Sequence, residues 1–320
     1  MQTLALVVRE VRQESPLIRA FRLAAADGGA LPPYTPGSHL KVQVPGLHDP
    51  RCYSLINTGG EAFAAPGEYR LGVRIEENSQ GGSRYMHALK EGDTITAQGP
   101  ANEFPLADHP GKTVLIAGGI GITPMASMAA SLAAKGNDYV LHYSGRSRGQ
   151  LAFLGELQAL AGDKLAVHAD DEPASAFDLD ALLDAAPAGQ HVYVCGPKGL
   201  IDAVIAGARK RDWDGKRVHF ELFTAAAPQA GDGAFEVELK QSGRVLQVPA
   251  DKTIIDVLEA AGCDPMYDCK RGECGVCQAT VLEGTPDHRD YYLSDAEKAK
   301  GNVIQMCISR AKSARLVLDL

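Results

Sequence analysis

The sequence predicts a multidomain protein made of an antiparallel β-barrel, an α/β domain with a parallel sheet, and a small α+β module. Three observations carry this prediction. Residues 1–108 hold short alternating apolar segments punctuated by Gly and Pro. Residues 109–224 alternate short apolar runs with helical stretches, and residues 234–320 join a hairpin pattern, a short helix and a cysteine-rich loop.

In the first part, alternating apolar segments predict short strands, with Gly28-Gly29 and Pro32-Pro33 among the turn signals. The predicted strands cover residues 4–8, 18–23, 39–44 and 68–75. Helical periodicity is weak apart from a short piece at 85–89. Many short strands with regular turns are typical of a barrel or a sandwich, and we expect a barrel.

The second part changes character, because short apolar runs now alternate with helical patterns. Strands are predicted at 114–117, 139–143, 165–168 and 191–195, and helices at 151–160, 178–184 and in a stretch that ends at 134. Gly196-Pro197 opens a further helix. Strands that alternate with helices in this way form a parallel sheet.

The third part begins after residues 225–233, whose small and turn-forming residues predict a flexible linker. Residues 235–239 and 245–248 then predict a hairpin. Residues 253–261 predict a short amphipathic helix that ends at Gly262.

Four cysteines near the C-terminus give the clearest chemical signal: Cys269, Cys274, Cys277 and Cys307. The first three follow the C-x4-C-x2-C spacing of plant-type [2Fe–2S] proteins, and we expect the fourth ligand to return from a distant strand. Zinc is the alternative, because C-x2-C is also half of a zinc site, but the sequence has no second half. A disulfide framework is disfavoured in a chain of this size with seven cysteines.

The bulk composition excludes several classes of protein. With a net charge of −8 and no basic run, the chain is not expected to bind nucleic acid. No apolar run approaches the length of a membrane span, and the N-terminal apolar stretch is too short for a signal peptide. We therefore expect a cytoplasmic protein without a membrane partner, in which the cysteines stay reduced or bind metal.

A glycine-rich turn follows the first predicted strand of the α/β part. Gly119 and Gly121 let the backbone approach a phosphate, and the helix that follows offers free N–H groups at its start. Pro124 stands where the full G-x-G-x-x-G fingerprint has its third glycine, so a plain tight turn stays open as an alternative. The run Cys195-Gly196-Pro197 ends another strand at the same edge of the sheet, where open α/β sheets bind their ligands.

A further group of polar residues lies in the β part. Arg51, Tyr53 and Ser54 place a cation, an aromatic face and a hydroxyl in one short segment, and Arg51 and Tyr53 share one face of a strand. The run Gly81-Gly82-Ser83-Arg84 precedes a helix and suits an anion. Composition alone favours the simpler interpretation of an exposed strand and a flexible loop.

The order of these motifs resembles the phthalate dioxygenase reductase family, which includes the reductases of vanillate O-demethylase and carnitine monooxygenase. The resemblance covers nearly the whole chain. It rests on Arg51-x-Tyr53-Ser54, Gly81-Gly82-Ser83, Gly119-x-Gly121-x-Thr123-Pro124, Cys195-Gly196-Pro197 and the four cysteines. It implies an FMN-binding barrel at 1–108, an NAD-binding α/β domain at 109–224, a linker at 225–233, and a β-grasp ferredoxin domain at 234–320.

The resemblance also implies which residues hold the cofactors. FMN would contact Arg51, Tyr53, Ser54, Val73, Arg74, Gly82, Ser83 and Phe223. NAD would contact Gly119, Gly121, Thr123, Pro124, Arg146, Cys195, Gly196 and Pro197. The cluster would be held by Cys269, Cys274, Cys277 and Cys307. No catalytic acid or base is implied, since the cofactors carry the chemistry.

The implied activity is electron transfer from NADH through FMN and the [2Fe–2S] cluster to a Rieske-type oxygenase that demethylates or hydroxylates an organic substrate. Arg146 and Arg148 follow the second strand of the α/β part, where an acidic residue would favour NADH, so NADPH stays open as a donor. Two other functions stay open: an FAD-containing reductase of the phenylacetyl-CoA epoxidase type, and a redox-sensing iron–sulfur flavoprotein. The short 81–83 loop, with no aromatic platform for an adenine, favours FMN.

Overall fold

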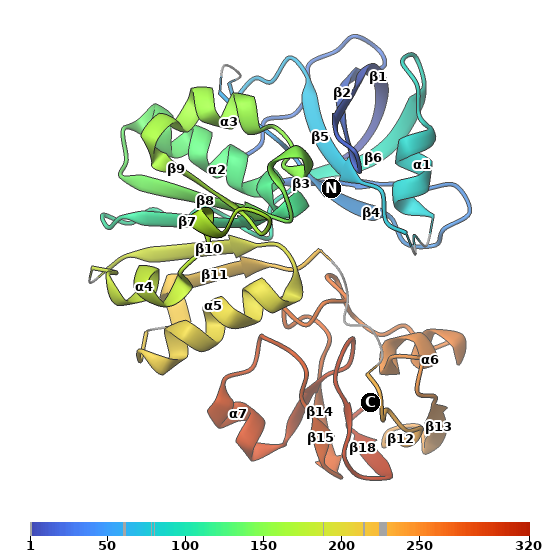
Figure 1. Cartoon of the computed structure of the whole chain (residues 1–320). Coiled ribbons are helices and arrows are strands. Elements are labelled where there is room, and N and C mark those ends of the chain that lie inside the picture. The colour runs from blue at the N-terminus through green and yellow to red at the C-terminus, as the bar shows by residue number, and fades with distance from the viewer. Residues whose placement is uncertain are drawn as a thin grey trace. The chain divides into compact units, whose positions relative to one another are not determined.

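The computed structural model describes residues 2–59, 62–77, 79, 81–187, 189–213, 215–223 and 229–320. It divides into two compact units, Met1–Glu221 and Leu222–Leu320, each with its own sheets (Figure 1). The first four residues of the predicted linker, 225–228, lie outside the described residues.

The N-terminal part of the first unit is a curled antiparallel sheet of six strands, in the order β4-β3-β6-β1-β2-β5. Its strands are β1 (Thr3–Ser15), β2 (Ile18–Ala25), β3 (His39–Val42), β4 (Arg51–Ser54), β5 (Tyr69–Arg74) and β6 (Thr94–Ala101). An isolated bridge between Leu55, directly after β4, and Leu71 of β5 joins the two edge strands. Helix α1 (Gly82–Ala88) follows β5.

Alternation along the strands explains why these residues form a curled sheet with one buried face. In β1, Leu4, Leu6 and Val8 are buried and the residues between them face outward. Ile95 and Ala97 of β6 follow the same period of two. Since successive side chains of a strand point to opposite faces, the apolar set fills a single core inside the curl.

The second part of the first unit is a parallel sheet of five strands, in the order β11-β10-β7-β8-β9. Its strands are β7 (Thr113–Gly118), β8 (Tyr139–Gly145), β9 (Leu165–Ala169), β10 (His191–Cys195) and β11 (Val218–Glu221). Its helices are α2 (Ile122–Lys135), α3 (Leu154–Ala161), α4 (Leu179–Asp184) and α5 (Lys198–Lys210). Helices α2 and α3 cover one face of the sheet, and α4 and α5 cover the other (Figure 1).

Short 3₁₀ turns complete this part: η1 (Gly119–Gly121), η2 (Arg148–Gln150), η3 (Gly162–Lys164), η4 (Pro173–Ser175) and η5 (Gly215–Arg217). The predicted helix at 151–160 begins later, at Leu154, because Phe153 adopts a left-handed conformation with φ of 61°. Its ring is buried beneath the Arg70 guanidinium, 4.7 Å from the ring centroid, and this packing holds the unusual backbone.

An ion cluster ties the curled sheet to the parallel-sheet part within the first unit. Arg70 of β5 is almost fully buried, and its Nη2 donates to Glu156 Oε1 of α3 at 2.9 Å and to Glu14 Oε1 of β1 at 3.2 Å. Hydrogen bonds from Arg70 lower the pKa of Glu156 to about 2. The two sheets of this unit are therefore joined by charges as well as by apolar contacts.

The second unit is built on a mixed sheet in the order β13-β12-β18-β14-β16, in which β12 and β18 run parallel. Its strands are β12 (Phe235–Leu239), β13 (Arg244–Val248), β14 (Gln278–Glu283), β16 (Val303–Gln305) and β18 (Arg315–Leu318), with β15 (Pro286–Asp287) and β17 (Arg310–Ala311) as a separate pair. Its helices are α6 (Ile254–Ala260) and α7 (Asp295–Lys300). Both helices begin with a capping box, Thr253 with Asp256 and Ser294 with Glu297.

Candidate functional site

The predicted flavin segments of the first unit lie against each other. A Cβ added to Gly82, at the start of α1, would stand 2.7 Å from Arg51 Cγ and 3.2 Å from Tyr53 Oη of β4. Any larger residue at 82 would displace the Arg51 side chain. The structure therefore brings together a cation, an aromatic ring and the start of a short helix from two segments that are distant in the sequence.

The remaining flavin candidates of the first unit lie on β5 and in the loop after it. Val73 is buried in the barrel core, and Arg74 Nη1 contacts Glu76 Oε1 at 2.7 Å. The Ser83 hydroxyl accepts a hydrogen bond from the Glu76 backbone N–H at 3.1 Å. Glu76 thus contacts both Arg74 and Ser83, two of the predicted FMN-binding residues.

Three further details complete the flavin candidates. Burial raises the pKa of the Tyr53 hydroxyl. Ser54, at the end of β4, is buried. Phe223 belongs to the second unit and its side chain is 37% exposed.

The two glycine motifs of the parallel sheet meet at the carboxyl ends of β7 and β10. A Cβ on Gly121 would lie 2.1 Å from the Cys195 carbonyl oxygen, and a Cβ on Gly118 would lie 2.6 Å from Pro197 Cδ. A Cβ on Gly196 would lie 2.9 Å from the Cα of Gly118. The two backbone segments are in contact here, at the carboxyl edge of the parallel sheet. Phosphates of bound nucleotides commonly contact backbone N–H groups at such an edge.

The helix that follows this turn uses its first side chains for its own structure. Gly119 takes a positive φ of 54°. The Thr123 hydroxyl is buried and donates to the Ile120 carbonyl at 3.1 Å, and Pro124 is buried in the first turn of α2. What this segment offers to a ligand is therefore backbone rather than side chain.

An acidic residue reaches this edge from the end of β9, the strand predicted at 165–168. Arg148, after β8, donates through Nε to both carboxylate oxygens of Glu172, at 2.8 and 2.9 Å. Glu172 follows β9, which pairs with β8 in parallel register. The backbone N–H of Asp171 also donates to the Arg146 carbonyl at 3.3 Å, while the Arg146 side chain is exposed. Both predicted arginines thus lie beside the 170–172 acidic run.

The four thiols of the second unit gather around one loop. Cys269 and Cys274 are partly exposed, and Cys277 and Cys307 are buried. Hydrogen bonds from Cys274, the larger effect, and from Cys307 lower the pKa of Cys269. A hydrogen bond from Cys307 likewise lowers the pKa of Cys277. The bond with Cys269 raises the pKa of Cys274, and bonds with Cys269 and Cys277 raise that of Cys307. Cys307 lies in a turn two residues beyond β16 rather than within a strand, because the chain must bend back to the loop.

The loop backbone is shaped to face anionic sulfur. Gly272 and Gly275 both have φ of 77°, and Lys270 has φ of 52°. This path lets the Arg271 N–H donate to Cys269 Sγ at 3.3 Å, and the Glu273 N–H also lowers the pKa of Cys269. Four thiols with backbone donors aimed at sulfur fit a [2Fe–2S] cluster. No three His, Cys, Asp or Glu side chains of the described residues are arranged to hold a lone metal ion.

Two side chains near the thiols were not singled out from the sequence. Gln305, the last residue of β16, is fully buried, and its Oε1 lies 3.5 Å from Cys277 Sγ. Tyr292 is 52% exposed, and its ring lies where a Cβ on Gly275 would be 2.3 Å from Cζ. The only signal for Gln305 is an amide inside the apolar run before Cys307.

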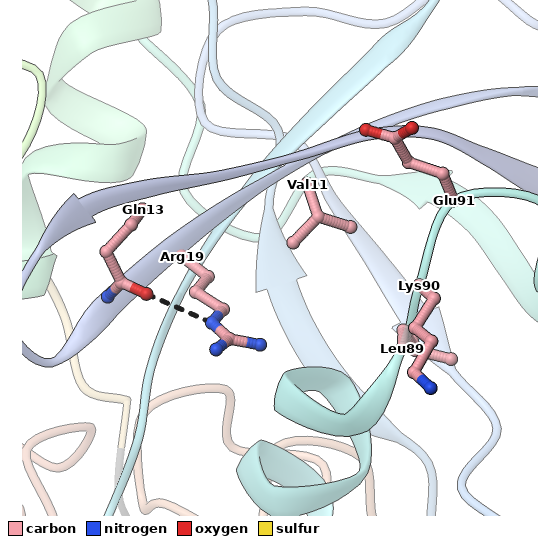
Figure 2. Close-up of a pocket in the computed structure, with 6 residues that line it drawn as sticks. All are labelled: Val11, Gln13, Arg19, Leu89, Lys90 and Glu91. Carbon is pink, nitrogen blue, oxygen red and sulfur yellow. Dashed lines mark hydrogen bonds between the residues drawn. The ribbon is translucent and has the colours of Figure 1, made fainter.

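A hollow outside these sites opens on the curled sheet beyond α1 (Figure 2). Its volume is about 540 Å³, and Arg19 Nε donates across one side of it to Gln13 Oε1 at 3.1 Å. It is lined by Val11, Gln13, Arg19, Leu89, Lys90 and Glu91. None of the predicted site residues lines it. Among the described residues, no helix has the length and apolarity to cross a membrane.

A curled antiparallel sheet, a parallel sheet with a glycine-lined edge and a four-cysteine module together define the class of iron–sulfur flavoprotein oxidoreductases. Residues 237–312 match the family described as "2Fe-2S iron-sulfur cluster binding domain". Residues 94–218 match "Dimethylamine monooxygenase subunit DmmA-like, N-terminal domain".

Full-length similarities identify the family within this class. The chain is 43% identical over 319 residues to the vanillate O-demethylase oxidoreductase of a Pseudomonas species, covering 98% of this chain and 99% of the relative. It is 40% identical over 315 residues to the carnitine monooxygenase reductase subunit of Acinetobacter baumannii, covering 98% and 97%. The solved phthalate dioxygenase reductase superposes with a TM-score of 0.73 at 37% identity, covering 99% of this chain and 98% of that one. The chain belongs to the phthalate dioxygenase reductase family, and the predicted fold class is confirmed.

Proposed function

We propose that this protein is the NADH-dependent reductase component that supplies electrons to a Rieske-type oxygenase, which demethylates or hydroxylates an organic substrate. When bound, NADH supplies a hydride, FMN divides the electron pair, and the [2Fe–2S] cluster carries single electrons. The observation that carries the proposal is the thiol-lined loop with backbone donors aimed at sulfur, in one chain with the glycine-lined edge of a parallel sheet. The relatives named for vanillate demethylation and carnitine oxygenation support the kind of partner.

The residues divide the work by domain, and we assign FMN to 1–108, NAD to 109–224 and the cluster to 234–320, with 225–233 as the linker. In the first of these, Arg51 offers a cation to the FMN phosphate beside Gly82, and Tyr53 offers a ring face to the flavin. The other proposed FMN contacts are Ser54, Val73, Arg74, Ser83 and Phe223. Every one of these residues binds or orients, and none has to move a proton.

The dinucleotide site relies on backbone groups. Gly119 leaves room for the pyrophosphate, Gly121 lets the turn pack against the end of β10, and Cys195 and Gly196 border the nicotinamide. Thr123, Pro124, Arg146 and Pro197 complete the proposed NAD contacts. Cys269, Cys274, Cys277 and Cys307 are the proposed cluster ligands.

We also place the protein in the cytoplasm. The described cysteines form no disulfide, and the cytoplasm keeps thiols reduced. NADH, the proposed donor, is a cytoplasmic reductant, which agrees with this location.

An anaerobic titration of the purified full chain with NADH tests the proposal. We expect flavin and iron–sulfur absorbance to bleach together, and the extracted flavin to have the mass of FMN. The matched control is Cys307→Ser, which should keep flavin bleaching and lose the iron–sulfur bands. A wild-type spectrum with flavin alone, or with no response to NADH, would contradict the proposed electron path.

A further inference from the structure

A buried amide touches one of the four thiols. Gln305 ends β16 with a fully buried side chain, and its Oε1 lies 3.5 Å from Cys277 Sγ. Its Nε2 donates to Gln278 Oε1 at 3.0 Å. Gln278 is the cross-strand partner of Gln305 on β14, so the β14–β16 register aligns both amides with the sulfur.

Burying an amide costs free energy unless its groups are hydrogen-bonded. The neighbours Ile304 and Met306 are buried and apolar, so a Leu or Met at 305 would suit packing alone. Instead the chain places there a side chain with two donors and one acceptor oxygen. The polar choice therefore points to the sulfur it contacts.

The oxygen and the nitrogen of the amide suit two different states of the sulfur, the thiol and the iron-bound thiolate. A thiol donates its proton, and Gln305 Oε1 accepts it, as the geometry here records. A thiolate that binds iron has no proton and only accepts. Since the amide oxygen and nitrogen have nearly the same shape, a half-turn presents Nε2–H to the sulfur. Gln278, an exposed amide, then turns to donate to Gln305 Oε1.

We propose that Gln305 donates an N–H···S hydrogen bond to Cys277 in the cluster-bearing protein and raises the reduction potential of the cluster. Reduction adds one negative charge, which the sulfurs share, so a donor to sulfur stabilises the reduced form more than the oxidised form. Gln278 is the residue that orients the amide. This inference rests on the proposed function in one respect, that these cysteines hold a cluster.

The experiment is a redox titration of the cluster in the full chain, followed by the EPR signal of its reduced form. Gln305→Met keeps an unbranched side chain of similar length and removes the donor. We expect the reduction equilibrium to fall about tenfold, a shift of about 59 mV to more negative potential for one electron. Gln278→Leu should shift the potential in the same direction by less, because Gln305 remains.

The matched control is Gln247→Met on β13, an exposed amide of the same unit that donates to Glu236 at 2.8 Å. It should leave the potential unchanged. A Gln305→Met protein with a full EPR signal and an unshifted potential overturns the inference. A wild-type protein with no EPR signal contradicts the proposed function itself. Failure of the inference and failure of the proposed function therefore give different results.

A second measurement keeps the inference testable if Gln305→Met loses its cluster. Wild-type protein labelled with ¹⁵N in the glutamine side chains should show a ¹⁵N hyperfine coupling in the pulsed EPR of the reduced cluster. The coupling should persist in Gln278→Leu and in Gln247→Met, so that neither of those glutamines is its source. Absence of any glutamine coupling in the wild type also overturns the inference.

Discussion

The glycine-lined edge of the first unit and the cysteine loop of the second are built by opposite means. At the edge, Gly118, Gly121 and Gly196 work through the side chains they lack, because two backbones lie within contact of each other. In the loop, the thiols are the proposed ligands, and Gly272 and Gly275 provide the left-handed turns that present them. The comparison teaches that glycine at a cofactor site can mean close approach in one place and backbone conformation in another.

The largest expected effect of this difference is at Gly121. Its backbone is ordinary, with φ of −61°, but an added Cβ would lie 2.1 Å from the buried Cys195 carbonyl oxygen. Neither backbone can yield without moving β7 or β10. We expect Gly121→Ala to lower the free energy of unfolding by about 3 kcal/mol, at the upper end for overpacking, and to abolish flavin reduction by NADH.

The measurement is urea unfolding together with stopped-flow flavin reduction. The control is Gly155→Ala in α3, where an added Cβ meets nothing within 4 Å. That variant should be as stable as the wild type or more so by up to about 1 kcal/mol. Equal stability of Gly121→Ala and the wild type would show that the edge is not closely packed.

A smaller effect is expected at Gly275, although the nominal overlap is similar. An added Cβ would lie 2.3 Å from Tyr292 Cζ, but that ring is half-exposed and can swing outward. The cost that remains is the left-handed backbone, about 1–2 kcal/mol. We expect Gly275→Ala to keep its cluster with reduced stability of the second unit, and Gly275→Asn to recover part of the loss.

Gly272 provides the contrast within the same loop. Its added Cβ would meet Ile308 Cγ2 at 2.7 Å and the backbone of buried Asp290 at 3.1 Å. Gly272→Ala should therefore lose much of its iron and sulfide. Iron and acid-labile sulfide per chain measure both variants. Cluster loss in Gly275→Ala equal to that in Gly272→Ala would refute the distinction between an exposed ring and buried backbone.

The parts of the site that the sequence predicted are those encoded by nearby residues. The spacing from Cys269 to Cys277 is itself the loop, so the cluster module could be recognised without knowing the fold. The turn at Gly119 and Gly121 likewise lies between one strand and one helix. The order of strands and helices followed from periodicity, since burial alternates or clusters along each segment.

The parts that could not be predicted depend on strand register or on tertiary packing. Gln305 contacts Cys277 only because β16 pairs with β14. Strand β6 is absent from the predicted strands, and Gly99-Pro100 within it has the composition of a turn. Helix α3 began late because Phe153 takes a left-handed conformation that helical periodicity does not reveal.

Glu172 belongs to this second group, and it gives the smallest of the expected effects. The sequence showed arginines after β8 and no acid, but Glu172 arrives from β9 and engages Arg148 through both carboxylate oxygens. A paired Arg148 is less available to the extra phosphate of NADPH, and the 170–172 acidic run repels that phosphate. We propose that this pair favours NADH. Side chains would then set the nucleotide preference of a site whose shape is formed by backbone.

Replacing the Glu172 carboxylate tests whether the backbone of the sheet edge alone sets the preference between NADH and NADPH. Glu172→Gln frees Arg148 and removes one negative charge, so the NADPH-to-NADH ratio of kcat/KM should rise about fivefold, worth roughly 1 kcal/mol, the upper range for an exposed ion pair. Asp163→Asn makes the same charge change near the amino end of β9, in η3, and should leave the ratio unchanged. The double variant Arg148→Gln with Glu172→Gln should lose most of the gain. If it keeps the gain, Arg148 is not the group that receives the phosphate, and if Glu172→Gln shows none, nucleotide preference is set by the backbone edge itself.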